Sequence, residues 1–226
     1  MNFVVTESWR QAFRGASAGF VALEGVSNPP GHPALEAHLR EVEADLRARF
    51  AGATRAELAA LPEFQAYRAH YRQWDKTYHV QLQWESVVLK GKPLRSAGAL
   101  VTAMFAAEMR NRLLTAGHDV DRLDGAVSLC VSRGGETYAG MGERPLTLQP
   151  GDMFMSDGTG IISNVLYGPD HRTRLTESST RAVFTVYAPA GIQPEAVRDH
   201  LDEIARMVRL VSPGAAVLRQ EVHTAG

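Results

Sequence analysis

The sequence predicts an α+β fold, in which a central, mostly antiparallel sheet is flanked by helices. Three observations predict it. Apolar residues at helical spacing dominate the first half of the chain, short β-branched runs between glycine- and proline-containing turns dominate the second half, and a further amphipathic segment follows them. With 226 residues, 45% hydrophobic and 22% charged, the composition is that of an ordinary globular protein.

The helices are predicted from apolar periodicity. Between Pro33 and Phe50, leucine and valine recur every three or four residues, which indicates an amphipathic helix. Thr54 and Glu57 have the spacing of a capping box, so a short helix should follow Thr54. Further helices are expected from Pro62 onward, with Phe64, Tyr67, Tyr71 and Trp74 on one face, over Ser96–Leu114 and over Pro194–Leu210.

The strands are predicted from short apolar runs bounded by turn residues. They are expected at residues 3–5, 16–25, 127–131, 136–139, 146–148, 153–156, 161–167 and 182–187. The segment WDKTYHVQLQWES, residues 74–86, leaves two alternatives open. Alternation of His79, Gln81 and Gln83 with apolar residues favours a strand, whereas the continuation to Leu89 fits a helix equally well.

One globular unit is expected, with three parts along the chain. Residues 1–60 would form a strand and helical extension packed on the core. Residues 61–212 would form the main domain, including its closing helix, and the Gly/Ala-rich residues 213–226 would be a flexible tail.

Charge and motifs exclude several function classes. The net charge of −1 provides no global field for nonspecific nucleic-acid binding, so any RNA contact must come from a local patch. The single cysteine, Cys130, lies in an apolar run and is expected to be a small buried hydrophobe. The sequence contains no CxxC, HExxH, P-loop, GxGxxG or GxSxG motif, so no metal or cofactor is expected. No segment has transmembrane length, and a cytoplasmic protein without membrane contact is expected.

Three polar stretches are candidates for a site. The first is 74–86, where His79, Gln81 and Gln83 would line one face of a strand. The second is GHDVD, with His118 and two aspartates that could equally cap a turn. The third, Ser156–Thr176, is either a pocket wall or a polar hairpin, and its donors and acceptors are Ser163, Asn164, Tyr167, Asp170, His171, Arg172 and Thr173.

The order of several short motifs resembles a known family. KGKPL, an apolar helix, GHDVD-x-L, a strand, GGETYAGMGE, QPGDMFMSDGTGII and RTRLTESSTRAVFTVY follow one another over roughly residues 64–188. This succession is similar to the B3/B4 domain of the phenylalanyl-tRNA synthetase β subunit, and above all to free-standing proteins that consist of that domain. The resemblance implies an α+β domain with a cleft, which in the synthetase hydrolyses tyrosine wrongly attached to the phenylalanine tRNA.

The resemblance places acidic residues well and the editing pocket less well. Asp119, Asp121 and Leu123 match the synthetase corner, and Asp152 and Asp157 match the acids that flank a later strand. The synthetase histidine falls on Ala116, while His118 takes the place of an aromatic residue. The synthetase asparagine falls near Met104 or Phe105, and the glutamate that reads the tyrosine hydroxyl falls close to Asp170.

The resulting hypothesis is a free-standing deacylase of mischarged aminoacyl-tRNA. His79 or His118 would orient the water, and Asn164, Ser163 or amides near Gly160 would donate to the developing oxyanion. The remaining ligand-binding candidates are Trp84 and Tyr167 beside the amino-acid side chain, Glu85, Asp119 and Asp170 at the α-ammonium group, and Thr173 in the pocket wall. The alternatives are a non-catalytic module that binds tRNA or an amino acid, and an enzyme acting on another amino-acid-derived small molecule.

Overall fold

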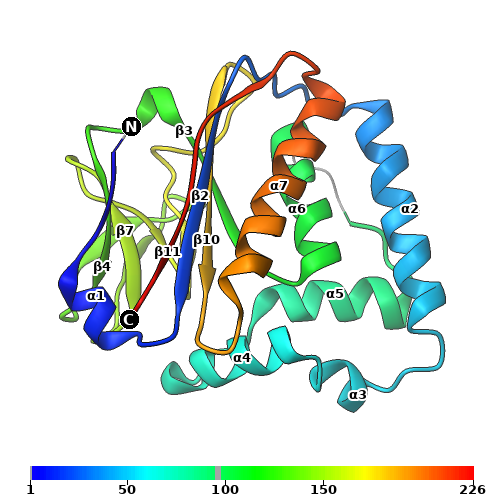
Figure 1. The fold of residues 1–226 in the computed structure, drawn as a ribbon, viewed down its shortest axis with the longest axis horizontal. Coiled ribbons are helices and arrows are strands. Elements are labelled where there is room, and N and C mark those ends of the chain that lie inside the picture. The colour runs from blue at the N-terminus through cyan, green and yellow to red at the C-terminus, as the bar shows by residue number, and fades with distance from the viewer. Residues whose placement is uncertain (1, 95–97) are drawn as a thin grey trace.

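The computed structural model describes residues 2–94 and 98–226 and confirms the α+β class. Two sheets are stacked face to face, and helices cover the outer face of one of them (Figure 1). The helices are α1 (Glu7–Ala12), α2 (Pro33–Arg49), α3 (Arg55–Ala59), α4 (Pro62–Tyr71), α5 (His79–Lys90), α6 (Ala99–Asn111) and α7 (Pro194–Val211), with 3₁₀ turns at Arg72–Trp74 and Val120–Arg122.

The helix-covered sheet is antiparallel throughout. Its four strands lie in the order β11 (Ala216–Thr224), β2 (Ser17–Glu24), β10 (Arg181–Ala188) and β3 (Leu114–Asp119). β2 pairs with β10 over its whole length, from Ser17↔Ala188 to Glu24↔Arg181. The first sixty residues therefore contribute a central strand of this sheet. β3 is an edge strand, so one side of its backbone is not paired with another strand of this sheet.

The second sheet has the order β1 (Phe3–Val5), β4 (Val127–Val131), β7 (Met153–Ser156), β8 (Ile161–Asn164) and β9 (Gly168–Pro169). Only its β1–β4 pair is parallel, so the expectation of a mostly antiparallel sheet is confirmed. A small hairpin of β5 (Thr137–Ala139) and β6 (Pro145–Thr147) extends beside it.

A close contact fixes each interface of the central sheet. On one face, the ring of Phe20 from β2 stacks on Phe3 of the second sheet, with 4.7 Å between centroids. On the other face, α7 packs directly on β2, because a Cβ at Gly19 would lie only 2.7 Å from Val197 and 3.0 Å from Leu201. The buried stripe of α7 that includes these two residues was predicted from its periodicity and is confirmed.

The capping box before α3 is also confirmed. The Thr54 side chain accepts from the Glu57 backbone, and the Glu57 carboxylate accepts from the Thr54 backbone N–H at 2.8 Å. The helix expected over Ser96–Leu114 forms as α6, although Ser96 and Ala97 lie outside the described residues. It ends at Asn111 because Arg112 adopts a left-handed conformation with φ 61°, which turns the chain into β3.

Two local predictions were wrong, and one open alternative was decided. The alternating segment 74–86, for which strand and helix had both been considered, is mostly helical: Val80, Trp84 and Val87 form a buried stripe at helical spacing in α5. The stretch that contains His118 is strand β3 itself, not a turn between helix and strand. The strand expected over 161–167 ends at Asn164, because the side-chain Oδ1 of Asn164 accepts the Leu166 and Tyr167 backbone N–H groups and bends the chain.

The Gly/Ala-rich tail was predicted to be flexible, and this too was wrong. Residues Ala216–Thr224 form β11, which pairs antiparallel with β2 across the full length of that strand. Beyond it, Ala225 is buried and exchanges backbone hydrogen bonds with Gly15 and Ala16. Figure 1 shows this last strand lying beside β2. Within residues 2–94 and 98–226, no helix is both long enough and apolar enough to cross a membrane.

Candidate functional cleft

A cleft of 370 Å³ opens along the free edge of β3, between that edge, the helices α5 and α6, and the chain after β9. This volume lies within the range of small-molecule sites. Most of its walls are apolar. Its lining residues are His79 and Gln83 from α5, Val101, Met104, Phe105 and Glu108 from α6, Thr115, Ala116 and Gly117 from β3, and Met141, Pro169, Arg174 and Leu175.

Helix α5 divides the polar residues that a strand would have placed on one face. His79 and Gln83 are four residues apart, so they share a helical face and both line the cleft. Gln81 points to the opposite side of α5, where its amide donates to Glu85 at 2.7 Å. The cleft therefore receives one imidazole and one amide from this stretch.

Glu108 is the main polar group of the cleft. Its side chain is 2% exposed, and one carboxyl oxygen accepts the Thr115 backbone N–H at 2.8 Å. The other oxygen has no hydrogen-bond partner among the described residues. Burial raises the pKa of Glu108 to about 8, while the Thr115 hydrogen bond lowers it by less. The carboxyl group is therefore mostly neutral at pH 7 and can donate an O–H to a ligand.

A neutral hydrogen-bond chain supports the strand beside Glu108. The Asn111 amide lies 3.1 Å from Nδ1 of His200, and Nε2 of His200 lies 2.7 Å from the Thr115 hydroxyl. Burial lowers the pKa of His200 to about 3, so the ring is neutral. If Asn111 donates to Nδ1, Nε2 carries the proton and donates to Thr115. The chain thus fixes the side chain of Thr115 from behind the cleft.

The β3 backbone adds a second ligand contact. Thr115 and Asp119 both point their N–H groups away from β10, toward Glu108 and toward the Thr173 carbonyl at 2.8 Å. Because alternate residues of an antiparallel strand point the same way, the Gly117 peptide also faces the open edge. No described residue outside the β3–β10 ladder binds that peptide group.

Two basic side chains stand in the wall of the cleft. His79 has an exposed surface, yet the protein atoms packed around it lower its pKa by desolvation. Its imidazole is accordingly neutral at pH 7 and able to accept a proton. Arg174 donates to the His171 carbonyl at 2.7 Å and supplies the positive charge of the cleft. Together with Glu108, these groups give the cleft a base, a cation and a neutral acid.

His118 lies outside the cleft, in a sealed network. It is fully buried, and its Nδ1 lies 2.7 Å from the Thr173 hydroxyl, which donates in turn to Asp170. Arg172 lies 3.7 Å from Asp170 and 2.8 Å from Asp157. Desolvation, with the nearby Arg172 charge, lowers the pKa of His118 to about 4. Three predicted site residues therefore meet, but none of them lines the cleft.

Asn164 and Trp84 have structural contacts, whereas the buried Ser163 hydroxyl has no hydrogen-bond partner among the described residues. The Asn164 amide donates to Asp152 at 2.6 Å and its oxygen holds the turn after β8, while the neighbouring Ser163 is fully buried. Trp84 is a core residue whose indole donates to the Met109 carbonyl at 2.9 Å.

Three further candidates lie in contacts away from the cleft. Glu85 pairs with Arg55 at 2.9 Å, and Asp119 accepts from the Asp121 backbone and the Ser179 hydroxyl. Tyr167 lies under the Lys76 ammonium group, 5.2 Å from its ring centroid. Of the ten predicted site residues, all within the described part of the chain, His79 alone lines the cleft.

Several residues that line the cleft were not predicted as site residues. They include Ala116, Met104 and Phe105, at which the resemblance had suggested only that the synthetase histidine and asparagine are absent. Glu108 was overlooked, although a lone carboxylate within the apolar run AMFAAEM is a signal, because a charged group is rarely buried without a role. Arg174 and Gly117 carry no such signal, since only the packing of the 170–175 chain against β3 places them together.

No family model matches the sequence, and no curated protein matches it. Among solved structures, the chain is similar to an N-terminal fragment of the phenylalanyl-tRNA synthetase β subunit from Pyrococcus horikoshii. The TM-score is 0.50 at 10% sequence identity, over 98% of this chain and 50% of that chain. This chain thus spans about half the length of that fragment, and the similarity shows a shared α+β fold.

Proposed function

We propose that the cleft binds an amino-acid-like group in the manner of a B3/B4-type domain, and that its ligand is the aminoacyl group at the 3′ end of a tRNA. One observation carries this proposal. At the base of a mostly apolar cavity, Glu108 is buried with one carboxyl oxygen unpaired, next to the free edge of β3. An isolated polar group in such a position is expensive unless a ligand satisfies it.

The cleft offers complementary groups to each part of an aminoacyl ester. Val101, Phe105 and Leu175 provide apolar contacts for the side chain. Glu108 can bind the α-amino group, as an acceptor when ionised or as a donor to the neutral amine. The Gly117 peptide can bind the acyl oxygen from the strand edge.

Hydrolysis, in this proposal, uses His79 as the general base. The neutral imidazole takes a proton from water as the water oxygen adds to the acyl carbon. The bond from that carbon to the 3′ oxygen then breaks, and the 3′ oxygen takes up the proton. The products are a free amino acid and uncharged tRNA. Gly117 N–H would stabilise the oxyanion, since the position of the synthetase histidine holds Ala116, which cannot donate.

A non-catalytic binding module is the second candidate. The observation that favours it is the apolar character of Ala116, Met104 and Phe105 in the cleft lining, near which the resemblance would place the synthetase histidine and asparagine. These side chains can hold an amino-acid side chain but cannot position water. Under this alternative the cleft binds the aminoacyl group and leaves the ester intact.

Release of amino acid from a panel of charged tRNAs tests the proposal. We expect hydrolysis of at least one species above the rate in buffer, and a loss of about 10²–10⁴-fold in His79→Ala. Glu108→Gln should weaken substrate binding, while Glu177→Gln and His38→Ala, which lie outside the cleft lining, should match the unaltered protein. Binding of a non-hydrolysable aminoacyl analogue without any release would favour the binding module. If neither release nor binding occurs across the panel, the proposal is wrong.

A further inference from the structure

We infer that a basic groove on the side of α5 opposite the cleft binds the phosphodiester backbone of an RNA strand. The basic groove has a volume of 680 Å³ and lies between α3, α4 and the start of α5. The residues that define it here are Arg55, Arg68, Arg72, Lys76, Thr77 and Gln81. This inference rests on the proposed function only in taking the RNA as the carrier of the aminoacyl group.

The positive charge of the groove is largely uncompensated. The Arg72 side chain has no hydrogen bond or ion pair within residues 2–94 and 98–226. Arg68 donates only to the Ala59 carbonyl, at 3.5 Å, and Lys76 contacts only the ring of Tyr167 among the described residues. Arg55 pairs with a carboxylate, yet its side chain remains 69% exposed. None of the groove-lining residues is acidic.

Two nearby acidic residues are engaged outside the groove, and a third neutralises Arg55. Glu63 binds Arg112 through two hydrogen bonds of 3.0 Å, and Glu57 completes the capping box of α3. Glu85 is shared between Arg55 and Gln81. In a chain with a net charge of −1, the three groove cations that have no carboxylate partner among the described residues, Arg68, Arg72 and Lys76, form a local field that attracts an anion.

The start of α5 adds phosphate-binding capacity to the same groove. Tyr78 occupies the N-cap position and makes no side-chain hydrogen bond to the first turn. The first N–H groups of this 12-residue helix can therefore bind an anion, aided by the helix dipole. Thr77 and Gln81 line the groove on either side of this terminus.

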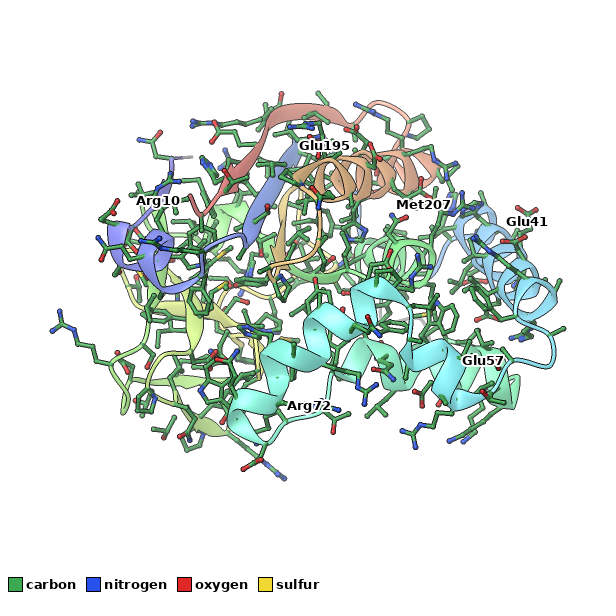
Figure 2. All side chains as sticks on the ribbon, turned by 60° about the horizontal axis from the view of Figure 1, so that its bottom comes forward. Arg10, Glu41, Glu57, Arg72, Glu195 and Met207 are labelled. Carbon is green, nitrogen blue, oxygen red and sulfur yellow. The ribbon has the colours of Figure 1, made fainter. Side chains whose placement is uncertain are left out.

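The arrangement of the cations fits a chain of phosphates better than a single one. Arg68 and Arg72 are four residues apart on α4 and the turn after it, a rise of ~6 Å along the axis. Arg55 and Lys76 extend the positive surface to α3 and to the segment before α5. Figure 2 shows α4 on the surface turned to the viewer, with Arg72 labelled near its C-terminal end and Glu57 on α3. An extended backbone can contact all three elements at once.

The groove and the cleft share one structural element. Gln81 lines the groove, whereas His79 and Gln83 line the cleft, on another face of the same helix. Lys76 covers Tyr167, and the chain continues from there to Pro169 in the cleft wall. An RNA strand that follows the groove toward the start of α5 would bring its end near the mouth of the cleft.

Fluorescence anisotropy with a labelled, uncharged 12-nucleotide RNA tests this inference, because uncharged RNA requires neither hydrolysis nor an aminoacyl group. We expect Arg68→Gln/Arg72→Gln to weaken binding at least tenfold at about 100 mM salt and to lower the salt slope by about 1.4, from two lost phosphate contacts. The matched control Arg198→Gln/Arg206→Gln removes the same charge from the exposed side of α7 and should bind within twofold of the unaltered protein.

Two further measurements distinguish RNA from smaller phosphate-containing ligands, and the basic groove from the cleft. ADP or inorganic phosphate at 1 mM should leave RNA binding unchanged, and displacement by either would identify a mononucleotide or phosphate site and overturn the RNA assignment. Ala116→Leu, which fills the cleft, should retain RNA affinity. Equal RNA binding by the groove variant and its matched control, or no RNA binding by the unaltered protein at 50 mM salt, would also overturn the inference. Melting curves verify that every variant is folded.

Discussion

Two regions along β3 differ in what they offer a ligand. Near one end of the strand, Glu108 keeps an unpaired carboxyl oxygen in a cavity of 370 Å³. Near the other, His118 is fully buried beside Thr173 and Asp170 and does not line the cleft. Both hold a buried titratable group beside a threonine. Both regions also hold a buried polar atom that has no partner among the described residues, a carboxyl oxygen of Glu108 and Nε2 of His118, so access to the cleft, more than the density of ionisable residues, distinguishes the candidate site.

The largest expected change is a loss of folding stability when the buried His118 side chain is removed. His118→Ala deletes a fully buried ring and removes one of the two hydrogen-bond partners of the Thr173 hydroxyl, so the free energy of unfolding should fall by about 2–4 kcal/mol. The folded variant should bind the cleft ligand normally. Urea unfolding measures the loss, and Thr173→Ser, which keeps the hydroxyl, is the milder control. If His118→Ala lost ligand binding and kept its stability, His118 would belong to the binding site and the assignment of the site to the cleft would be wrong.

Glu108 should give the stability of the protein a distinctive pH dependence. Its pKa is raised to about 8 by burial, so the folded state holds a proton that the unfolded chain has lost above its ordinary pKa of 4.5. The stabilisation is complete below pH 4.5 and declines as pH rises through 8. Between pH 6.5 and 9 the protein should therefore lose about 2 kcal/mol through this group.

Glu108→Gln removes this proton linkage and retains the acceptor for the Thr115 N–H. Urea unfolding at pH 6.5 and 9 should show a smaller loss of stability in the variant than in the unaltered protein, while Glu177→Gln keeps the original slope. Parallel pH curves for Glu108→Gln and the unaltered protein would mean that Glu108 is already ionised at pH 6.5, and the cleft would then contain a buried anion.

The smallest expected change in stability concerns the packing of Leu175 against Gly117 of β3. A Cβ at Gly117 would lie 2.8 Å from the Leu175 Cδ1 atom and 3.2 Å from the ring of Phe184. Gly117→Ala should cost about 1 kcal/mol and push Leu175 into the cleft. Leu175→Ala provides the matched partner, because it vacates that space. In a double-mutant cycle the two changes should be non-additive, and strict additivity would show that the leucine does not cover this glycine.

Much of the fold was predictable from local pattern. The strands at residues 127–131 and 153–156 and the helix containing Leu201 follow directly from apolar periodicity, and Thr54 with Glu57 indicated the start of α3. Local pattern failed where tertiary pairing decides. β11 exists because β2 offers it an edge, and α5 is helical because Trp84 and its neighbours pack as a helical stripe.

The candidate site was less predictable, for a physical reason. Motif density favoured His118, Asp170 and Asn164, but a polar group can serve the core as readily as a ligand, and only three-dimensional packing decides which. Ala116, Met104 and Phe105 line the cleft but were not predicted to belong to a site, because apolar side chains give no local signal for one. Glu108 became visible only with α6 placed against the edge of β3.

Ligand binding to the protein with a filled cleft tests the central claim most directly. The probes are 3′-aminoacylamino-adenosine analogues, which contain an amide in place of the ester, and the readout is calorimetric affinity for the unaltered protein and for Ala116→Leu. Ala116 lines the cleft and is not part of the His118 network, so its enlargement should block the site without unfolding the chain. We predict that at least one analogue binds and that Ala116→Leu weakens it tenfold or more. Equal affinity in the two proteins would place the ligand elsewhere and contradict the account.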